Sequence, residues 1–205
     1  MGGVQNPWLD NSLALWLPYI KPGTRHHYNG MGYNLAGKVM EIVTGKSIFH
    51  LFNEYLFEPL HLQHTMLDFD LAYGIRTTAF DMAIVGQMLL NEGAYGDLQF
   101  FSDETFEALL PVDLHNYYPE IENKKWGIGI TPMNRDLKNE ETGEYRNILS
   151  DQVIGHGSAT SSILNVDLEN KIVICQSRMD AGRQYNEYLN KAFLLIEKYY
   201  GRITP

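Results

Sequence analysis

The hydrophobic residues of this chain change their spacing near Lys125, and that change limits the folds that the chain can adopt. Before it, apolar residues recur three and four positions apart, as on one face of a helix. After it, they alternate with polar residues, as in half-buried strands, until a final helical stretch. Helices, then consecutive strands, then one more helix predict an α+β protein in which helices cover an antiparallel sheet.

Six segments carry the helical pattern, and several have recognisable ends. They are residues 12–20, 33–44, 48–58, 79–91, 103–110 and 184–200. Gly45 supplies a left-handed stop after the second segment, and Ser47 can cap the third. The last segment has an apolar face that we expect to be buried, and this face consists of Leu189, Phe193, Ile196 and Tyr200.

Four later segments are predicted to be strands, namely residues 126–131, 152–156, 161–166 and 171–178. The polar run between the first two, residues 134–146, predicts an exposed hairpin loop with Gly143 at its turn. A chain of 205 residues is long enough to bury a core and is expected to form one domain. Its mainly helical part spans about 20–125, and its sheet strands and terminal helix span 126–200.

Charge and hydropathy exclude two classes of partner. The formal net charge is −9, and no basic stretch offsets it. Such a balance argues against binding to nucleic acid or to an anionic membrane surface. No apolar run approaches the ~18 residues that cross a bilayer, so we expect no membrane segment.

The sequence also predicts neither a cofactor nor a metal. The single cysteine, Cys175, excludes an internal disulfide and a cysteine-based metal site. The histidines do not have the paired spacing of a zinc site. Residues 44–47 resemble the end of a phosphate-binding loop, but that motif needs glycine where Met40 stands.

Two segments are rich in residues that catalytic sites use, although their chemistry alone leaves the interpretation open. In residues 22–33, one proline and three glycines surround Tyr28, which can be a core anchor or a presented side chain. In residues 155–159, His156 stands between two glycines, which are also compatible with an ordinary closely packed strand. A lone histidine is more often structural than catalytic.

A set of five segments resembles the serine β-lactamase and penicillin-binding-protein superfamily, in particular its class C β-lactamase, esterase and D-aminopeptidase branch. In chain order they are residues 22–47, 57–65, 73–81, 88–93 and 155–159. The first resembles the region of the second active-site motif, Tyr-x-Asn, and the last resembles the third motif. The resemblance covers roughly residues 20–200, so the chain is identified as a single, partial domain of this fold.

The resemblance implies roles for residues of both motifs. Tyr28 matches the tyrosine that relays a proton to or from the catalytic serine, and His156 matches the Lys or His that lines the pocket. The backbone N–H of Ala159 would be an oxyanion-hole donor, a contact worth ~3 kcal/mol in comparable hydrolases. The substrate-binding residues implied in this way are Asn29, Gly30, Gly157, Ser158 and Ala159.

Two motif positions depart from the family pattern. Gly30 stands where the family has the asparagine whose amide contacts the substrate, and the neighbouring Asn29 is expected to face the other way. Ser158 stands where the family usually has glycine, which leaves less room along the strand. A neutral His156 in place of lysine suits esters or small amides better than anionic β-lactams.

The nucleophile of the family is missing from these residues. It belongs to a Ser-x-x-Lys motif, and none of the serines from Ser12 to Ser177 has lysine three positions on. We therefore expect the chain to be the C-terminal portion of a serine hydrolase that acts through an acyl-enzyme on an ester, amide or β-lactam bond. On this hypothesis the chain alone is inactive. The alternative is a catalytically inactive binding module.

The expected partners follow from these two hypotheses. They are a small-molecule or peptide-like substrate, and the missing N-terminal part or another chain that supplies it. A homo-oligomer is a further candidate, because the chain alone would expose sheet edges and apolar surface. The resemblance suggests a bacterial protein of the periplasm or the extracellular space, whereas the residues themselves leave the compartment and the substrate open.

Overall fold

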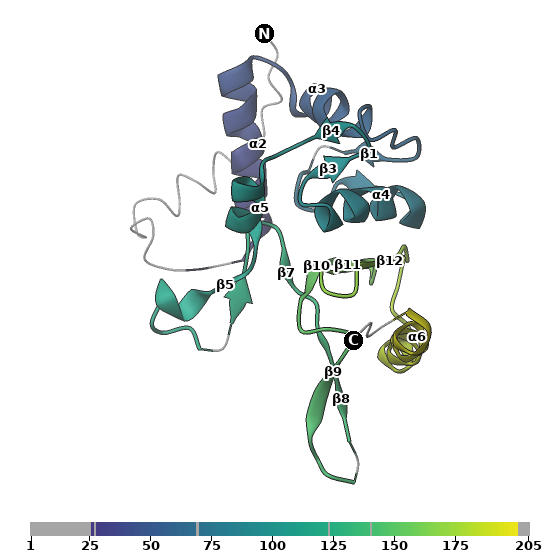
Figure 1. Ribbon diagram of the computed structural model, residues 1–205. Coiled ribbons are helices and arrows are strands. Elements are labelled where there is room, and N and C mark those ends of the chain that lie inside the picture. The colour runs from purple at the N-terminus through teal and green to yellow at the C-terminus, as the bar shows by residue number, and fades with distance from the viewer. Residues whose placement is uncertain (1–25, 27, 69, 123, 140, 201–205) are drawn as a thin grey trace. The chain divides into compact units, whose positions relative to one another are not determined.

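The computed structural model describes residues 26, 28–68, 70–122, 124–139 and 141–200. The chain divides into two units, which are described one at a time (Figure 1). Unit 1 comprises residues 1–77 and 115–121, and unit 2 comprises residues 78–114 and 122–205. A 3-10 turn, Leu114–Asn116, falls at their boundary. The helix predicted at 12–20 lies outside the described residues.

Unit 1 is built on two successive helices. Helix α2 spans Gly30–Thr44, and α3 spans Ile48–Phe52 and runs directly into a π-helical turn, Asn53–Phe57. Both sequence signals between them are confirmed. The N–H of Gly45 donates to the Glu41 carbonyl at the end of α2, and the Ser47 side chain accepts the N–H of His50 at the start of α3.

Helix α2 begins three residues earlier than its apolar pattern indicated, because Asn29 caps it at that point. Its buried residues are Asn34 and Gly37. Its apolar residues are exposed, namely Leu35, Val39, Met40, Ile42 and Val43. A short antiparallel pair follows α3 in the chain, with β1 at Met66–Leu67 and β2 at Ile75–Arg76.

Unit 2 contains a four-stranded antiparallel sheet in the order β12-β11-β10-β7. The strands are β7 (Thr131–Pro132), β10 (Val153–Gly157), β11 (Ile163–Asp167) and β12 (Ile172–Gln176). In the register of the central pair, Gly155 lies opposite Asn165 and His156 opposite Leu164. The three strands predicted at 152–178 are confirmed, with ends that differ by a few residues.

Helices cover both faces of this sheet, and Figure 1 shows α4 on one side and α6 on the other. Helix α4 (Ala79–Leu90) approaches Leu164 and Val173 at Gly86, which has no Cβ to keep them apart. On the opposite face, Ile163 packs with Leu189 and Phe193 of α6 (Tyr185–Tyr200). The α+β architecture predicted from the sequence is confirmed.

The terminal helix corrects one expectation. Leu189 and Phe193 are buried, as predicted, and Ile196 packs against the same core. Tyr200 is 70% exposed, so its predicted burial is wrong. Tyr200 is the last residue of the helix and lies beyond the core. Burial decreases along the helix, from the buried Leu189 and Phe193 to the partly buried Ile196.

Smaller elements complete unit 2. A third helix, α5, spans Asp103–Leu109 after the cap Ser102. The short antiparallel pairs are β3 (Ala94–Tyr95) with β4 (Leu98–Gln99), β5 (Val112–Asp113) with β6 (Lys125–Trp126), and β8 (Arg135–Lys138) with β9 (Tyr145–Ile148). Residues 134–146, predicted to be an exposed hairpin loop, contain most of this last pair, and Gly143 lies at the turn as expected.

The strand predicted at 126–131 is divided. Only its two ends pair, Trp126 in β6 and Thr131 in β7. Between them Gly129 has φ +74°, and the N–H of Gly127 donates to the Ile130 carbonyl over 2.8 Å. This hydrogen bond closes a turn, which the alternating apolar pattern did not predict.

Candidate active site

Tyr28 stands immediately before α2 in unit 1. Its side chain is 47% exposed. Its ring meets the ring of Tyr33 edge to face, with centroids 6.3 Å apart and planes at 80°. The neighbouring Asn29 is extended, with φ −154° and ψ 164°, and the helix starts at the next residue. Tyr28 therefore stands two residues before the first residue of a helix, and its ring contacts Tyr33 of that helix.

The side chain of Asn29 has a structural task. Its Oδ1 accepts the N–H of Met31 over 3.0 Å, which satisfies one of the donors left open at the start of a helix. The substrate-binding role predicted for Asn29 stays a prediction.

Gly30 lies against a loop that comes from later in the chain. A Cβ built on this residue would lie 2.8 Å from Cβ of Ala72 and 3.9 Å from Cε1 of Tyr73. The first distance is below any normal carbon–carbon contact, so a side chain at residue 30 would require the loop to move. The asparagine of the family pattern cannot simply be restored at this position.

Hydrogen bonds to α2 hold that loop in place. Asn34 is buried, and its Nδ2 donates to Oδ2 of Asp70 over 3.2 Å, while its Oδ1 accepts the N–H of Leu71 over 2.9 Å. Asp70 in turn accepts the N–H of Ala72 through Oδ1 over 2.8 Å. The approach of Ala72 to Gly30 is thus fixed by polar contacts one helical turn away.

Sequence reasoning missed Tyr33 as a member of this group. Burial raises the pKa of the Tyr33 phenol above its usual value, and the charge and hydrogen bonding of Tyr28 raise it further. Tyr33 therefore stays a neutral phenol beside Tyr28 at any ordinary pH. The available signal was its position, since a tyrosine in the first turn of the helix that follows Tyr28 can reach back to it.

His156 lies in the middle of unit 2, on β10. It faces the side of the sheet that α4 covers, because it pairs directly with Leu164, which contacts that helix. Burial lowers the pKa of His156 below its usual value, and a hydrogen bond with the Gly129 backbone offsets part of this. The imidazole is accordingly neutral at pH 7, as the sequence analysis supposed.

The two glycines beside His156 differ in what they allow. A Cβ on Gly155 would lie 1.8 Å from the Leu164 carbonyl oxygen, and its φ is +151°. A Cβ on Gly157 would meet only Cε of Met133, at 3.7 Å. The first glycine is thus required by the strand, whereas the second leaves open space at the strand end where the predicted site begins.

Ser158 closes a tight turn after β10. Its N–H donates to the Ser162 carbonyl over 2.8 Å, its Oγ accepts the N–H of Ser162 over 3.1 Å, and its hydroxyl lies 2.8 Å from Oγ1 of Thr160. The hydroxyl that departs from the family's glycine is therefore engaged within the turn.

Ala159 sits exposed in this turn. Within the part of the chain that the structure describes, its backbone N–H donates to no acceptor. A backbone N–H held by a hydrogen-bonded turn is the kind of group that can bind an oxyanion, because no reorganisation is needed when the charge forms.

Each unit thus contains one of the two predicted motifs. Tyr28, Asn29 and Gly30 lie together in unit 1, and His156, Gly157, Ser158 and Ala159 lie together in unit 2. Their roles in binding and catalysis stay predictions. Among the described residues, no group of three or more His, Cys, Asp and Glu side chains is arranged to hold a metal ion. Burial raises the pKa of the Cys175 thiol to about 11, so the thiol is not a nucleophile at neutral pH.

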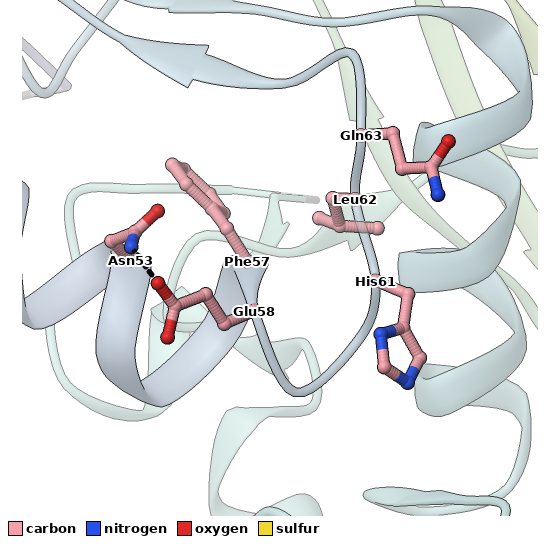
Figure 2. Close-up of a pocket in the computed structure, with 6 residues that line it drawn as sticks. All are labelled: Asn53, Phe57, Glu58, His61, Leu62 and Gln63. Atoms are coloured by element: carbon pink, nitrogen blue, oxygen red, sulfur yellow. Dashed lines mark hydrogen bonds between the residues drawn. The ribbon is translucent and has the colours of Figure 1, made fainter.

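Unit 1 also has an open hollow of about 430 Å³, which none of the predicted site residues lines (Figure 2). Phe57 and Leu62 are its buried apolar lining. Glu58, which accepts a hydrogen bond from Nδ2 of Asn53, lies across from His61 and Gln63. None of these six residues belongs to either motif, so the hollow does not extend the candidate site.

Residues 7–175 match the family described as Beta-lactamase, which is more than half of the chain. The chain belongs to the β-lactamase family. In keeping with this, it is a member of the serine β-lactamase and penicillin-binding-protein superfamily, whose members include hydrolases of several kinds. No helix in the described part of this β-lactamase-family chain is long and apolar enough to cross a membrane.

The curated relatives are longer than this family member. A protein of Escherichia coli O157:H7 named "Putative D-alanyl-D-alanine carboxypeptidase" is 24% identical in an alignment 205 positions long, which covers 75% of this chain and 45% of the relative. The protein of the same name from strain K12 is 23% identical over the same shares. The chain spans about half the length of the curated relatives it matches.

Three solved structures share the fold. A β-lactamase from Mycobacterium bovis matches with a TM-score of 0.67 and 18% identity, over 89% of this chain and 67% of that one. An octameric penicillin-binding protein homologue from Pyrococcus abyssi matches with 0.59 and 20%, over 93% and 48%. A D-stereospecific amidohydrolase from Streptomyces sp. matches with 0.56 and 17%, over 88% and 56%.

Proposed function

We propose that this chain is the C-terminal portion of a serine hydrolase that acts through an acyl-enzyme on an ester, amide or β-lactam bond. The catalytic serine, on this proposal, lies outside the chain, because no Ser-x-x-Lys motif occurs in its 205 residues. The chain would then be one partial domain, completed by a preceding segment or by another chain. Family membership supports the reaction class.

The observation that carries the proposal is the free N–H of Ala159. In acyl transfer the carbonyl oxygen becomes an oxyanion, and a backbone N–H aimed at it stabilises the transition state more than the ground state. Ala159 is an exposed residue of the turn that Ser158 closes, and its N–H has no acceptor among the described residues. The second donor would be the N–H of the serine itself.

Tyr28 and His156 would move and order protons in this reaction. The serine Oγ attacks the carbonyl carbon and passes its proton to the oxygen of Tyr28, which hands its own proton to the leaving group. A water then attacks the acyl-enzyme and releases the acid and the free serine. A neutral His156 would line the pocket and supply a hydrogen bond without a full positive charge, which favours neutral esters or small amides as substrates.

A binding module without catalysis is the second candidate. The substitution of the family asparagine by Gly30 favours it, because the loop residue Ala72 now occupies the space of that side chain. The two candidates make different predictions for any longer natural protein that contains this chain, so one experiment tests both.

The test compares this chain with the longest natural protein that contains it. Each is incubated with a chromogenic ester and with a fluorescent penicillin. Two results together support the hydrolase. A longer protein that carries Ser-x-x-Lys turns over the ester or is covalently labelled, and the 205-residue chain does not react. A longer protein without that motif, or one that neither turns over the ester nor is labelled, supports the binding module.

A further inference from the structure

We propose that Tyr73 takes the place of the family's motif asparagine and contacts the acyl part of the substrate. This inference rests on the proposed function, because it assigns a substrate contact to the same site. Its basis is the geometry around Gly30. The Cβ direction of residue 30 marks where the asparagine side chain would begin, and it leads to Cβ of Ala72 at 2.8 Å and Cε1 of Tyr73 at 3.9 Å.

Ala72 and Tyr73, the two residues near the Cβ position of residue 30, have different effects. Ala72 fills the position of the first side-chain atom, since 2.8 Å is well inside the carbon–carbon contact distance. The ring of Tyr73 lies at normal contact distance beyond it. The space that an amide would reach from residue 30 is therefore bordered by an aromatic ring from another segment of the chain.

The loop that carries Tyr73 is fixed on both sides of it. On one side, the Asp70 carboxylate accepts the N–H of Ala72 over 2.8 Å and is itself bound to the buried Asn34. On the other side, the N–H of Gly74 donates to the Asp70 carbonyl over 2.6 Å. A Cβ on Gly74 would lie 2.1 Å from that carbonyl oxygen, so the turn requires glycine. Tyr73 sits between two restrained neighbours.

Within this fixed loop the side chain of Tyr73 is open to a ligand. Tyr73 is 79% exposed, although its Cε1 lies 3.9 Å from a Cβ built on Gly30. Hydrogen bonding to Asp70 and its negative charge raise the pKa of the Tyr73 phenol. The group offered to a substrate is thus a neutral, pre-positioned aromatic ring.

The exchange of an amide for a ring changes the expected substrate class. An asparagine amide hydrogen-bonds a polar acyl group, such as the acylamino group of a peptide, whereas a phenol ring packs against apolar or aromatic groups. The substrates that fit this site are therefore esters or amides whose acyl group is aromatic or arylacetyl. Aromatic pairing of this kind is worth about two- to tenfold in affinity.

The test measures binding to the 205-residue chain, for which no nucleophile is needed. The ¹⁵N-labelled chain is titrated with N-phenylacetylglycinamide and, separately, with N-acetylglycinamide, and the amide resonances are followed by NMR. We expect the phenylacetyl compound to shift the resonances of Gly30, Ala72 and Tyr73 and to bind at least threefold more tightly than the acetyl compound. Equal binding of the two compounds, or shifts confined to other residues, would overturn the proposal.

Three variants separate the ring from the fold. Tyr73→Ala should bind the phenylacetyl compound about two- to tenfold more weakly, while Tyr73→Phe should retain wild-type affinity. Tyr55→Ala removes another exposed tyrosine of unit 1 and should leave binding unchanged. Unaltered binding in Tyr73→Ala overturns the proposal.

The proposed function can fail separately. A longer protein that forms no acyl-enzyme contradicts that function and leaves the binding result as it stands. If the longer protein is acylated, its preference for phenylacetyl over acetyl esters should fall about two- to tenfold in Tyr73→Ala. An unchanged preference overturns the role of Tyr73 and leaves the hydrolase function intact.

Discussion

The rings of Tyr28 and Tyr33 meet edge to face at the start of α2, with their centroids 6.3 Å apart. This contact gives the motif tyrosine a fixed neighbour within its own unit. Tyr33 belongs to the helix that Asn29 caps, and the next residue, Asn34, binds the loop that packs against Gly30. One helical turn therefore orders the phenol, the cap and the loop together.

The titration of Tyr33 should report this contact. Its pKa is raised chiefly by burial and secondly by Tyr28, so Tyr28→Phe should lower it only part of the way towards the usual value of about 10. NMR of ¹³C-labelled tyrosine rings measures this directly, with Tyr55→Phe as the control. If Tyr28→Phe leaves the pKa of Tyr33 unchanged, the two phenols do not interact.

The same pKa shift makes stability depend on pH in the alkaline range. Because the folded-state pKa of Tyr33 lies above the unfolded one, its contribution to stability is complete below about pH 10 and is lost as pH rises through the folded-state pKa. Denaturant unfolding of wild type and Tyr33→Phe over this range should show a smaller alkaline loss in the variant.

His156 should titrate below the ordinary histidine value. Burial is the main cause of its lowered pKa, so the neutral imidazole is the form that the fold favours. Its contribution to stability is then present above the unfolded-state pKa of about 6.5 and is lost as pH falls through the folded-state pKa. Ring-proton NMR assigned with His156→Gln measures it, and a pKa above the ordinary value would refute the burial argument.

Two glycines of α2 should respond in opposite ways to alanine. In Gly30→Ala the new methyl meets Cβ of Ala72 at 2.8 Å, and this overpacking should cost about 1–3 kcal/mol of unfolding free energy. In Gly32→Ala the methyl meets nothing within 4 Å, and the helix should gain about 0.5–1 kcal/mol. Urea unfolding of wild type and both variants measures these differences in unfolding free energy. Similar free energies for the two would contradict the contact between Gly30 and the loop.

Periodicity predicted which segments become helices and strands, but it carried no information on contacts between distant segments. Gly30 and Ala72 are far apart in the sequence, and neither residue type indicates that the Ala72 side chain packs against Gly30. The same limit explains the division of the strand predicted at 126–131, since its alternating residues concealed the turn at Gly129.

The sequence motifs predicted which segments carry the candidate site residues, but they did not predict the hydrogen bonds that those side chains make. The amide of Asn29 caps a helix, and the hydroxyl of Ser158 closes a turn. Both are local hydrogen bonds, and they depend on backbone angles that a motif does not specify. Tyr33 lies outside the Tyr-x-Asn motif, so the motif did not predict its contact with Tyr28.

The strand that carries His156 offers a matched pair of variants. Gly155→Ala would place a methyl 1.8 Å from the Leu164 carbonyl oxygen in a backbone conformation that side chains rarely adopt, so it should cost about 3 kcal/mol or more. Gly157→Ala meets only Met133, at 3.7 Å, and should change stability by less than about 1 kcal/mol. Thermal or urea unfolding distinguishes them, and a well-tolerated Gly155→Ala would contradict the register of β10 with β11.

Mass spectrometry of the acylated protein tests the proposed chemistry most directly. The longest natural protein that contains this chain, and the 205-residue chain itself, are each treated with a penicillin or a reactive ester and then digested. We predict one acyl adduct, on the serine of a Ser-x-x-Lys motif in the longer protein, lost in Ala159→Pro, which removes the N–H, and retained in Ala159→Gly. An adduct on any serine of the 205-residue chain, or no adduct on a longer protein that has the motif, would contradict this account.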